Sequence, residues 1–238
     1  MIPILLRDLG PRMLLVMFAG LILYALEPAF HQHGAAPAEM AAELGPLGIS
    51  ATLANLTRLS MLILLAGFIA NDRRRGYYRI FFSHPTNPLA FYALRWVIAL
   101  GVALLATALF LVVGQLAAWG EVRGGGAGLL LALLTAVAYG GLIAFLSAAL
   151  PRGDAWVTVL IFLFTFAWLQ VLALGAEPLT APIRQVITFL LPPETALRVI
   201  YASLMLGHIE WGAAMFVAGY GFFWLVAAGL LLRIREWP

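Results

Sequence analysis

Six long apolar stretches, separated by short polar or Gly- and Pro-rich segments, dominate the pattern along the chain. Each is close to the length of about 20 residues with which a helix crosses a hydrocarbon core of about 30 Å. No soluble domain fits between them. The pattern therefore predicts an all-α integral membrane protein with six transmembrane helices, in which residues 1–238 form a single transmembrane domain. The predicted spans are about 13–30, 51–70, 90–117, 129–150, 155–174 and 212–232.

Two further segments are partly apolar and too short to span. Residues 1–10 mix aliphatic side chains with one basic and one acidic residue, which predicts an N-terminal interfacial helix. Pro192 and Pro193 divide the apolar parts of residues 175–211, which predicts outer re-entrant helices before the last span. A cleaved signal peptide is the competing interpretation of the first stretch, because GAAPA at 34–38 offers small residues for cleavage.

Composition supports a membrane protein and excludes several kinds of chemistry. Hydrophobic residues make up 63% of the chain and charged residues 11%, with a mean hydropathy of +0.99. A soluble fold of this length could not hide so much apolar surface, and disordered chains are far more polar. The absence of cysteine excludes disulfides, thiolate metal sites and cysteine nucleophiles. All 14 basic residues are Arg, so the chain has no P-loop lysine and no ATP site of that type.

The arginines are distributed unevenly between the two faces of the predicted membrane domain. When both termini are placed on one side, ten of the 14 Arg residues fall on that side. Short loops rich in basic residues stay on the cytoplasmic side of membranes. We therefore expect a multi-pass protein of a bacterial-type cytoplasmic (inner) membrane with both termini cytoplasmic. Most basic residues lie beside apolar stretches, so the net charge of +3 indicates membrane orientation and no nucleic-acid partner.

The segment between the second and third spans is the most informative part of the sequence. Residues 71–88, NDRRRGYYRIFFSHPTNP, contain a basic cluster followed by a short aromatic stretch. Gly76 and Pro85 bound that stretch and limit it to a short helix. Aromatic residues together with Arg suit both lipid headgroups and protein interfaces. The segment is therefore either an inner-leaflet anchor or a helix that docks on a cytoplasmic partner.

This segment resembles the corresponding loop of the permease subunits of ABC-2 type ATP-binding-cassette transporters. Those permeases have an interfacial N-terminal helix, six spans and a loop in which Asp, basic residues, Gly and a later Pro precede the third span. Asp72, Gly76 and Pro85 fit that form, together with Arg73 and Arg74. A Pro-containing, partly re-entrant segment before the sixth span is also usual in the family. The resemblance covers essentially the whole chain.

The resemblance implies a transport subunit that is not itself an enzyme. Permeases of this family use a separate ATP-binding subunit, which holds the ATP and Mg, and they pair with a second permease copy or a paralogue in the membrane lipid. They move cargo by alternating access, and the few polar groups inside the spans predict an apolar or amphipathic cargo. The resemblance implies ATPase-subunit docking on Asp72, Arg73, Arg74, Arg75, Gly76, Tyr77, Tyr78, Arg79, Phe81, Phe82 and Pro85.

A few polar side chains inside the predicted spans mark a candidate translocation path. Arg58 in the second span and Glu27 in the first lie at similar depth, and an unpaired charge there is costly. We therefore expect them to be in contact, directly or through one water; separate snorkelling to the outer surface is the alternative. We expect no metal site, because His31 and His33 lack further ligands. The candidates for the path or the pair are Glu27, Asn55, Arg58, Gln115 and Gln170.

Two other function classes remain open. A secondary transporter or a membrane scaffold would share this composition, although such transporters often carry midplane acids, and here only Glu27 lies within a span. An intramembrane enzyme such as a rhomboid-like protease needs a Gly-x-Ser-Gly nucleophile and a His on a neighbouring helix. Ser147, in FLSAA, lacks that surround, so the enzyme class has less support.

Overall fold

The computed structural model describes residues 2–31, 48–76, 87–150, 152–173 and 180–236. These residues form helices and no strands, and six helical segments are long and apolar enough to cross a membrane, in agreement with the six expected spans. In chain order the helices are α1 (Ile2–Leu26), α2 (Pro28–His31), α4 (Ser50–Leu65), α5 (Ala70–Arg74), α7 (Pro88–Trp119), α8 (Gly126–Ala149), α9 (Asp154–Ala173), α10 (Ala181–Leu190), α11 (Glu194–Met205) and α12 (Trp211–Glu236).

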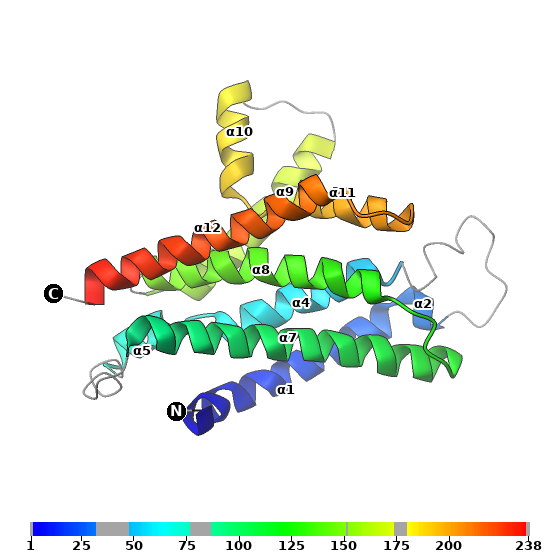
Figure 1. Ribbon diagram of the computed structural model, residues 1–238, viewed down its shortest axis with the longest axis horizontal. Coiled ribbons are helices and arrows are strands. Elements are labelled where there is room, and N and C mark those ends of the chain that lie inside the picture. Colours follow the sequence, from blue (N-terminus) through cyan, green and yellow to red (C-terminus); the bar gives the residue numbers. More distant parts are fainter. Residues whose placement is uncertain (1, 32–47, 77–86, 151, 174–179, 237–238) are drawn as a thin grey trace.

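Helix α8 lies at the centre of the bundle and packs against both α4 and α12 (Figure 1). Helices α1 and α7 pack against α4, and α7 also contacts α8. The first turns of α1 and the last turns of α12 point toward the end of the bundle that holds α5 (Figure 1). The opposite end holds α2 and the turn between α7 and α8.

The contact between α8 and α12 depends on glycine. The backbone of Gly221 occupies the space where a Cβ on Gly141 would lie, and the backbone of Val137 occupies the corresponding space beside Gly221. A side chain at either glycine would collide with the facing helix. In lipid, where the hydrophobic effect does not drive helices together, such close backbone approach favours their association.

The second predicted span, 51–70, is not one uninterrupted helix. Helix α4 ends at Leu65 and α5 begins at Ala70, and the chain turns at residues 66–69, which we call the α4–α5 break. Gly67 has a φ of 73°, the left-handed conformation with which glycine commonly ends a helix. A Cβ at Gly67 would also collide with the Asn71 side chain. The expectation of a continuous helix is therefore wrong at this point.

Helix α1 has no boundary near residue 10. It runs continuously from Ile2, with Pro11 inside it, and ends at Leu26. Pro28 begins the separate short helix α2, since proline lacks the amide that would continue α1 and is well suited to a first helical position. The first span is therefore interrupted before residue 30, the predicted end.

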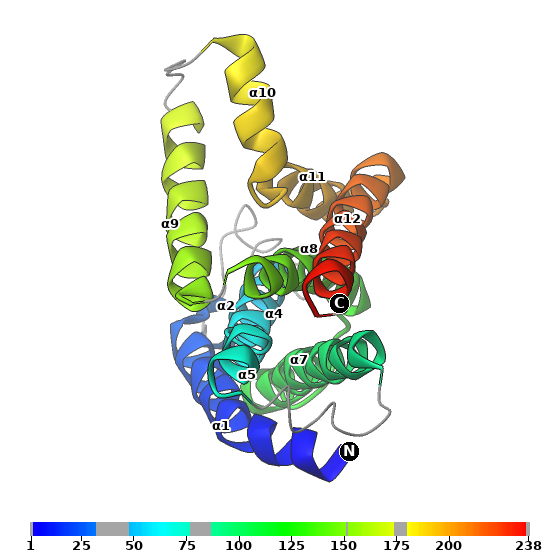
Figure 2. The same ribbon diagram turned by 90° about the vertical axis from the view of Figure 1, so that its left-hand side faces the viewer.

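Helices α9 and α10 stand out from the bundle, and α11 returns to it (Figure 2). Helix α9 packs on α8, while α11 packs on α12 and α8. Helix α10 has 10 residues and α11 has 12, and Pro192 and Pro193 lie between them. Neither helix is long enough to cross a bilayer.

Candidate functional site

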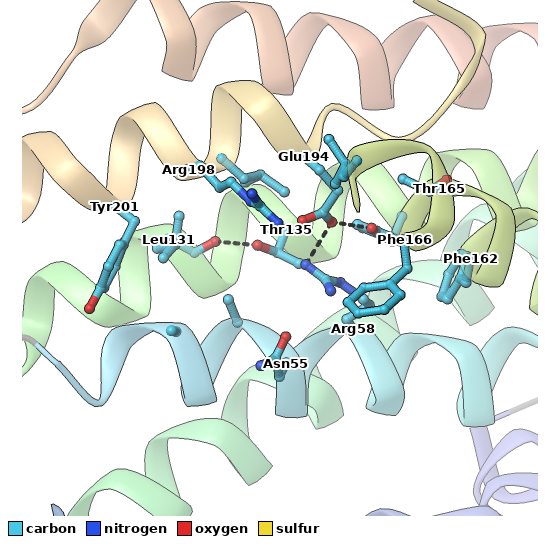
Figure 3. Close-up of a pocket in the computed structure, with 15 residues that line it drawn as sticks. Asn55, Arg58, Leu131, Thr135, Phe162, Thr165, Phe166, Glu194, Arg198 and Tyr201 are labelled. Carbon is cyan, nitrogen blue, oxygen red and sulfur yellow. Dashed lines mark hydrogen bonds and ion pairs between the residues drawn. The ribbon is translucent and has the colours of Figure 1, made fainter. Parts of the chain in front are cut away.

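A cavity of about 340 Å³ lies where α4, α8, α9 and α11 meet, and we call it the Arg58 cavity (Figure 3). Asn55 and Arg58, both predicted from the sequence as path residues, are in its wall. The wall consists of Ala51, Ala54, Asn55 and Arg58 of α4, Leu131, Thr135 and Tyr139 of α8, Phe162, Thr165, Phe166 and Leu169 of α9, and Glu194, Leu197, Arg198 and Tyr201 of α11.

Arg58 projects from α4 into this cavity and is held by two partners. Its Nη2 lies 2.6 Å from Oε1 of Glu194, the first residue of α11. Its Cζ lies 4.8 Å from the ring centroid of Tyr139 on α8, within the range of cation–π attraction. The Tyr139 hydroxyl donates a hydrogen bond to the same Glu194 oxygen. An arginine, a carboxylate and a phenol thus join three helices beside the cavity.

The cavity keeps excess positive charge after this pairing. Arg198, one turn beyond Glu194 in α11, is exposed and has no hydrogen bond or ion pair with any residue that the structure describes. The Arg58 Nε is buried and likewise has no hydrogen-bond partner in the described part of the chain. Two arginines and one carboxylate line the cavity, which gives a net charge of +1. The arrangement therefore favours an anionic group over a cationic one.

The expected direct contact between Glu27 and Arg58 is wrong. Glu27 is buried, and its carboxylate accepts hydrogen bonds from the Ala29 amide at 3.3 Å and from the Thr52 hydroxyl, so it caps α2 and ties it to α4. Arg58 follows Thr52 by nearly two helical turns and pairs with Glu194 instead. Similar depth in two neighbouring helices does not determine the direction in which each side chain points.

The two glutamines predicted for the path do not line the cavity. Gln115 is fully buried near the end of α7, where its amide donates to the Gly124 carbonyl at 2.8 Å and accepts from the Arg123 amide at 2.6 Å. It therefore secures the turn between α7 and α8, where backbone groups lack helical partners. Gln170 is exposed on α9.

A second cluster of buried polar contacts surrounds the α4–α5 break. The Gly67 amide donates to Asp154 Oδ2 at 3.0 Å, and the amides of Ile69 and Ala70 both donate to Ser147 Oγ at 3.1 Å. The remaining amides of the break, those of Ala66 and Phe68, donate to the carbonyls of Leu62 and Leu65 at the end of α4. Unpaired backbone amides are costly where water is excluded. Side chains from α8 and α9 therefore replace the carbonyl acceptors that an unbroken helix would supply.

Two arginines satisfy carbonyl groups at the same break. Nη1 of Arg12, on α1, lies 2.8 Å from the Leu64 carbonyl and 3.1 Å from the Ala66 carbonyl. Nη1 of Arg95, on α7, donates to the Phe68 carbonyl at 3.0 Å. The break is consequently tied by side chains to four helices, α1, α7, α8 and α9.

The predicted docking segment begins inside this cluster. Asp72 forms a buried ion pair with Arg95, with 2.9 Å between Oδ2 and Nη1. Nη1 of Arg73 donates to the Ala148 carbonyl at 2.6 Å, whereas Arg74 is exposed. The other described members are the exposed Arg75 and the half-buried Gly76. The predicted docking residues outside the described part of the chain are Tyr77, Tyr78, Arg79, Phe81, Phe82 and Pro85.

Comparisons with protein-family models, with curated proteins and with solved structures find no match to this chain. Among the described residues, no group of three or more His, Cys, Asp or Glu side chains is placed to hold a metal ion. The chemistry of the site therefore follows from its geometry. A positively charged, partly apolar cavity lies about two turns along α4 from the α4–α5 break, which side chains of four other helices hold by hydrogen bonds.

Sequence reasoning missed the residues that complete both clusters. Glu194 counts in the sequence only as an acid of the outer segment, although its place directly after two prolines is typical of a helix start. Gly67 in an apolar stretch is the one signal for the break. Ser147 and Asp154 give no such signal, because their role depends on which helices are neighbours.

Proposed function

We propose that the chain is the permease subunit of an ATP-binding-cassette transporter of the ABC-2 type, driven by a separate ATP-binding subunit. The observation that carries this proposal is the α4–α5 break. It lies directly before residues 71–88, the segment that carries the family resemblance, and side chains from α1, α7, α8 and α9 hold it. Motion imposed on the segment by a partner would therefore reach four spanning helices as well as α4.

The buried pair of Asp72 and Arg95 makes this connection stiff. Asp72 belongs to the docking segment and Arg95 to α7, and separating them would break a buried ion pair, which is strongly destabilising. From the break, α4 continues for about two turns to Arg58, so a tilt of α4 would change the cavity between α4, α8, α9 and α11. In the proposed cycle, ATP and Mg act on the partner subunit, and the cavity takes up cargo in one conformation and releases it in another.

The proposed topology places the protein in a bacterial-type cytoplasmic membrane with both termini cytoplasmic. The Arg distribution and the common direction of the α1 start and the α12 end support this orientation (Figure 1). Helices α10 and α11 would be outer re-entrant helices, since both are too short to span. The first turns of α1 would lie in the interface, and a second copy or a paralogue would complete the transporter.

The test is co-purification with ATP hydrolysis. A tagged chain extracted in mild detergent from its native membranes should bring with it a subunit that hydrolyses ATP. Because this chain has no lysine, a P-loop activity in the preparation must belong to that other subunit. Replacing Tyr78 and Phe81 by Asp should abolish co-purification and ATP-dependent transport while the chain still inserts into the membrane.

Trp211→Asp is the matched control, because Trp211 is an exposed aromatic residue that begins α12, far along the chain from residues 71–88. This variant should keep the ATPase subunit. Absence of any ATPase subunit from the wild-type preparation would contradict the proposal and favour a secondary transporter or a scaffold. If both variants lost the ATPase subunit equally, the assignment of residues 71–88 as the docking site would be wrong.

A further inference from the structure

The Arg58 cavity combines a charged side and an apolar side. Glu194 and the two arginines, Arg58 and Arg198, come from α4 and α11, while Phe162 and Phe166 come from the facing surface of α9 (Figure 3). A volume of about 340 Å³ is at the small end of the range for ligand sites, enough for a headgroup and part of one chain. A wall of this kind matches a molecule that is itself charged at one end and apolar at the other.

We propose that this cavity binds the anionic headgroup, a carboxylate or a phosphate, of a single-chain amphiphile. Arg198 would form the ion pair with the headgroup, and the Arg58 Nε would donate a second hydrogen bond. Glu194 does not neutralise Arg198, because its carboxylate is engaged by Arg58 and Tyr139. The net charge of +1 on the lining matches one anionic group.

Arginine is the side chain best suited to this role. Its planar guanidinium is always charged and binds carboxylates and phosphates through two parallel hydrogen bonds. Arg58 is held in position by the Tyr139 ring and by Glu194, so its guanidinium is fixed in place before a ligand arrives. Preorganised donors lose less entropy on binding. The further claim that this amphiphile is the transported cargo rests on the proposed function. The claim that it binds in the cavity is independent of that function.

The experiment measures binding to the purified chain alone, without any ATPase subunit. The chain is placed in nanodiscs of zwitterionic phosphatidylcholine at mildly alkaline pH, and dansyl-undecanoic acid is the probe. Energy transfer from the tryptophans to the dansyl group reports binding, with empty discs as background. Dodecanoate and dodecyl phosphate should displace the probe, and the stronger competitor identifies the preferred headgroup. Dodecanol, which has the chain without the charge, and inorganic phosphate, which has the charge without the chain, should not.

Two variants should change the affinity in opposite directions. Arg198→Gln should weaken probe binding roughly tenfold, the loss expected for one charge-assisted hydrogen-bonded contact. Glu194→Gln should strengthen it, because Arg58 loses its anionic partner and the lining gains one net positive charge. Arg184→Gln is the matched control, since Arg184 is a half-buried arginine of helix α10 that does not line this cavity, and it should leave the affinity unchanged.

Arg198 is exposed and has no partner among the described residues, so its replacement should not disturb folding, and size-exclusion chromatography verifies this.

Equal displacement by dodecanol would overturn the anionic headgroup, and displacement by inorganic phosphate alone would overturn the amphiphile. Equal weakening in Arg198→Gln and Arg184→Gln, or weakening in Glu194→Gln, would overturn the site. Binding without ATP-coupled transport would contradict only the proposed function, and coupled transport without binding would contradict only this inference.

Discussion

At the α4–α5 break, the Arg95 and Asp72 side chains are 5% and 10% exposed, whereas at the cavity those of Arg58 and Glu194 are 24% and 13% exposed. Both places use an arginine paired with a carboxylate. At the break the backbone amides of residues 66–69 are all satisfied by neighbouring groups. At the cavity a further arginine, Arg198, remains without a partner in the described part of the chain. Satisfied backbone amides and a buried ion pair produce a structural joint, and excess charge beside a cavity leaves room for a ligand.

The largest expected effect tests the joint. Asp72→Ala leaves Arg95 buried without its carboxylate, and breaking a buried pair in this way typically costs about 3–5 kcal/mol. We expect a loss of that size in unfolding measurements on the detergent-solubilised protein. Arg123→Ala is the control, because Arg123 and Glu121 form a pair whose side chains are 50% and 65% exposed, and exposed pairs contribute under about 1 kcal/mol. Similar losses of unfolding free energy in the two variants would show that the buried pair of Asp72 and Arg95 stabilises the protein no more than an exposed pair does.

A smaller effect is expected from the backbone of the break. Gly67→Ala forces a side chain into the left-handed region, at about 1–2 kcal/mol, and pushes it against Asn71. Gly101→Ala is the matched control, because Gly101 lies within α7 with open space around it. There alanine removes the helix penalty of glycine, up to about 1 kcal/mol. The two substitutions should therefore change stability with opposite signs. A neutral Gly67→Ala would mean that α4 continues through residues 66–69.

The sequence predicts the helices far better than it predicts their connections. Helix α7, Pro88–Trp119, encloses the predicted stretch 90–117, because a long apolar run in a chain that must cross lipid has few alternatives to a helix. The α4–α5 break cannot be predicted from the apolar pattern in this way. Its apolar residues look like those of any span, and the groups that stabilise the break are far away in the chain, at Arg12, Ser147 and Asp154.

The candidate site shows the same limit. Arg58 stands out in the sequence because a charge inside a span needs a partner, and the structure provides one. The partner is Glu194 and not Glu27, because the short helix α11 packs against α8 and brings its first residue to the level of Arg58. No rule based on depth along two successive spans could find a residue from a helix as short as α11 that follows much later in the chain.

The smallest expected effect concerns this choice of partner. A double-mutant cycle of Arg58→Gln and Glu194→Gln, measured by unfolding in detergent, should give a coupling free energy of roughly 1 kcal/mol, the upper part of the range for partly exposed pairs. The matched cycle of Arg58→Gln and Glu27→Gln should give a coupling indistinguishable from zero, since Glu27 bonds to Ala29 and Thr52 instead.

These two cycles share one variant, so any general destabilisation by Arg58→Gln cancels between them. A clear coupling with Glu27 and none with Glu194 would mean that the first two spans supply the charge partner and that α11 is not held at the cavity. Glu194 would then no longer offset one of the two arginines of the lining, and the reason for expecting Glu194→Gln to strengthen anion binding would be lost. Coupling with Glu194 alone keeps α11 at the cavity and leaves Arg198 as the free charge beside it.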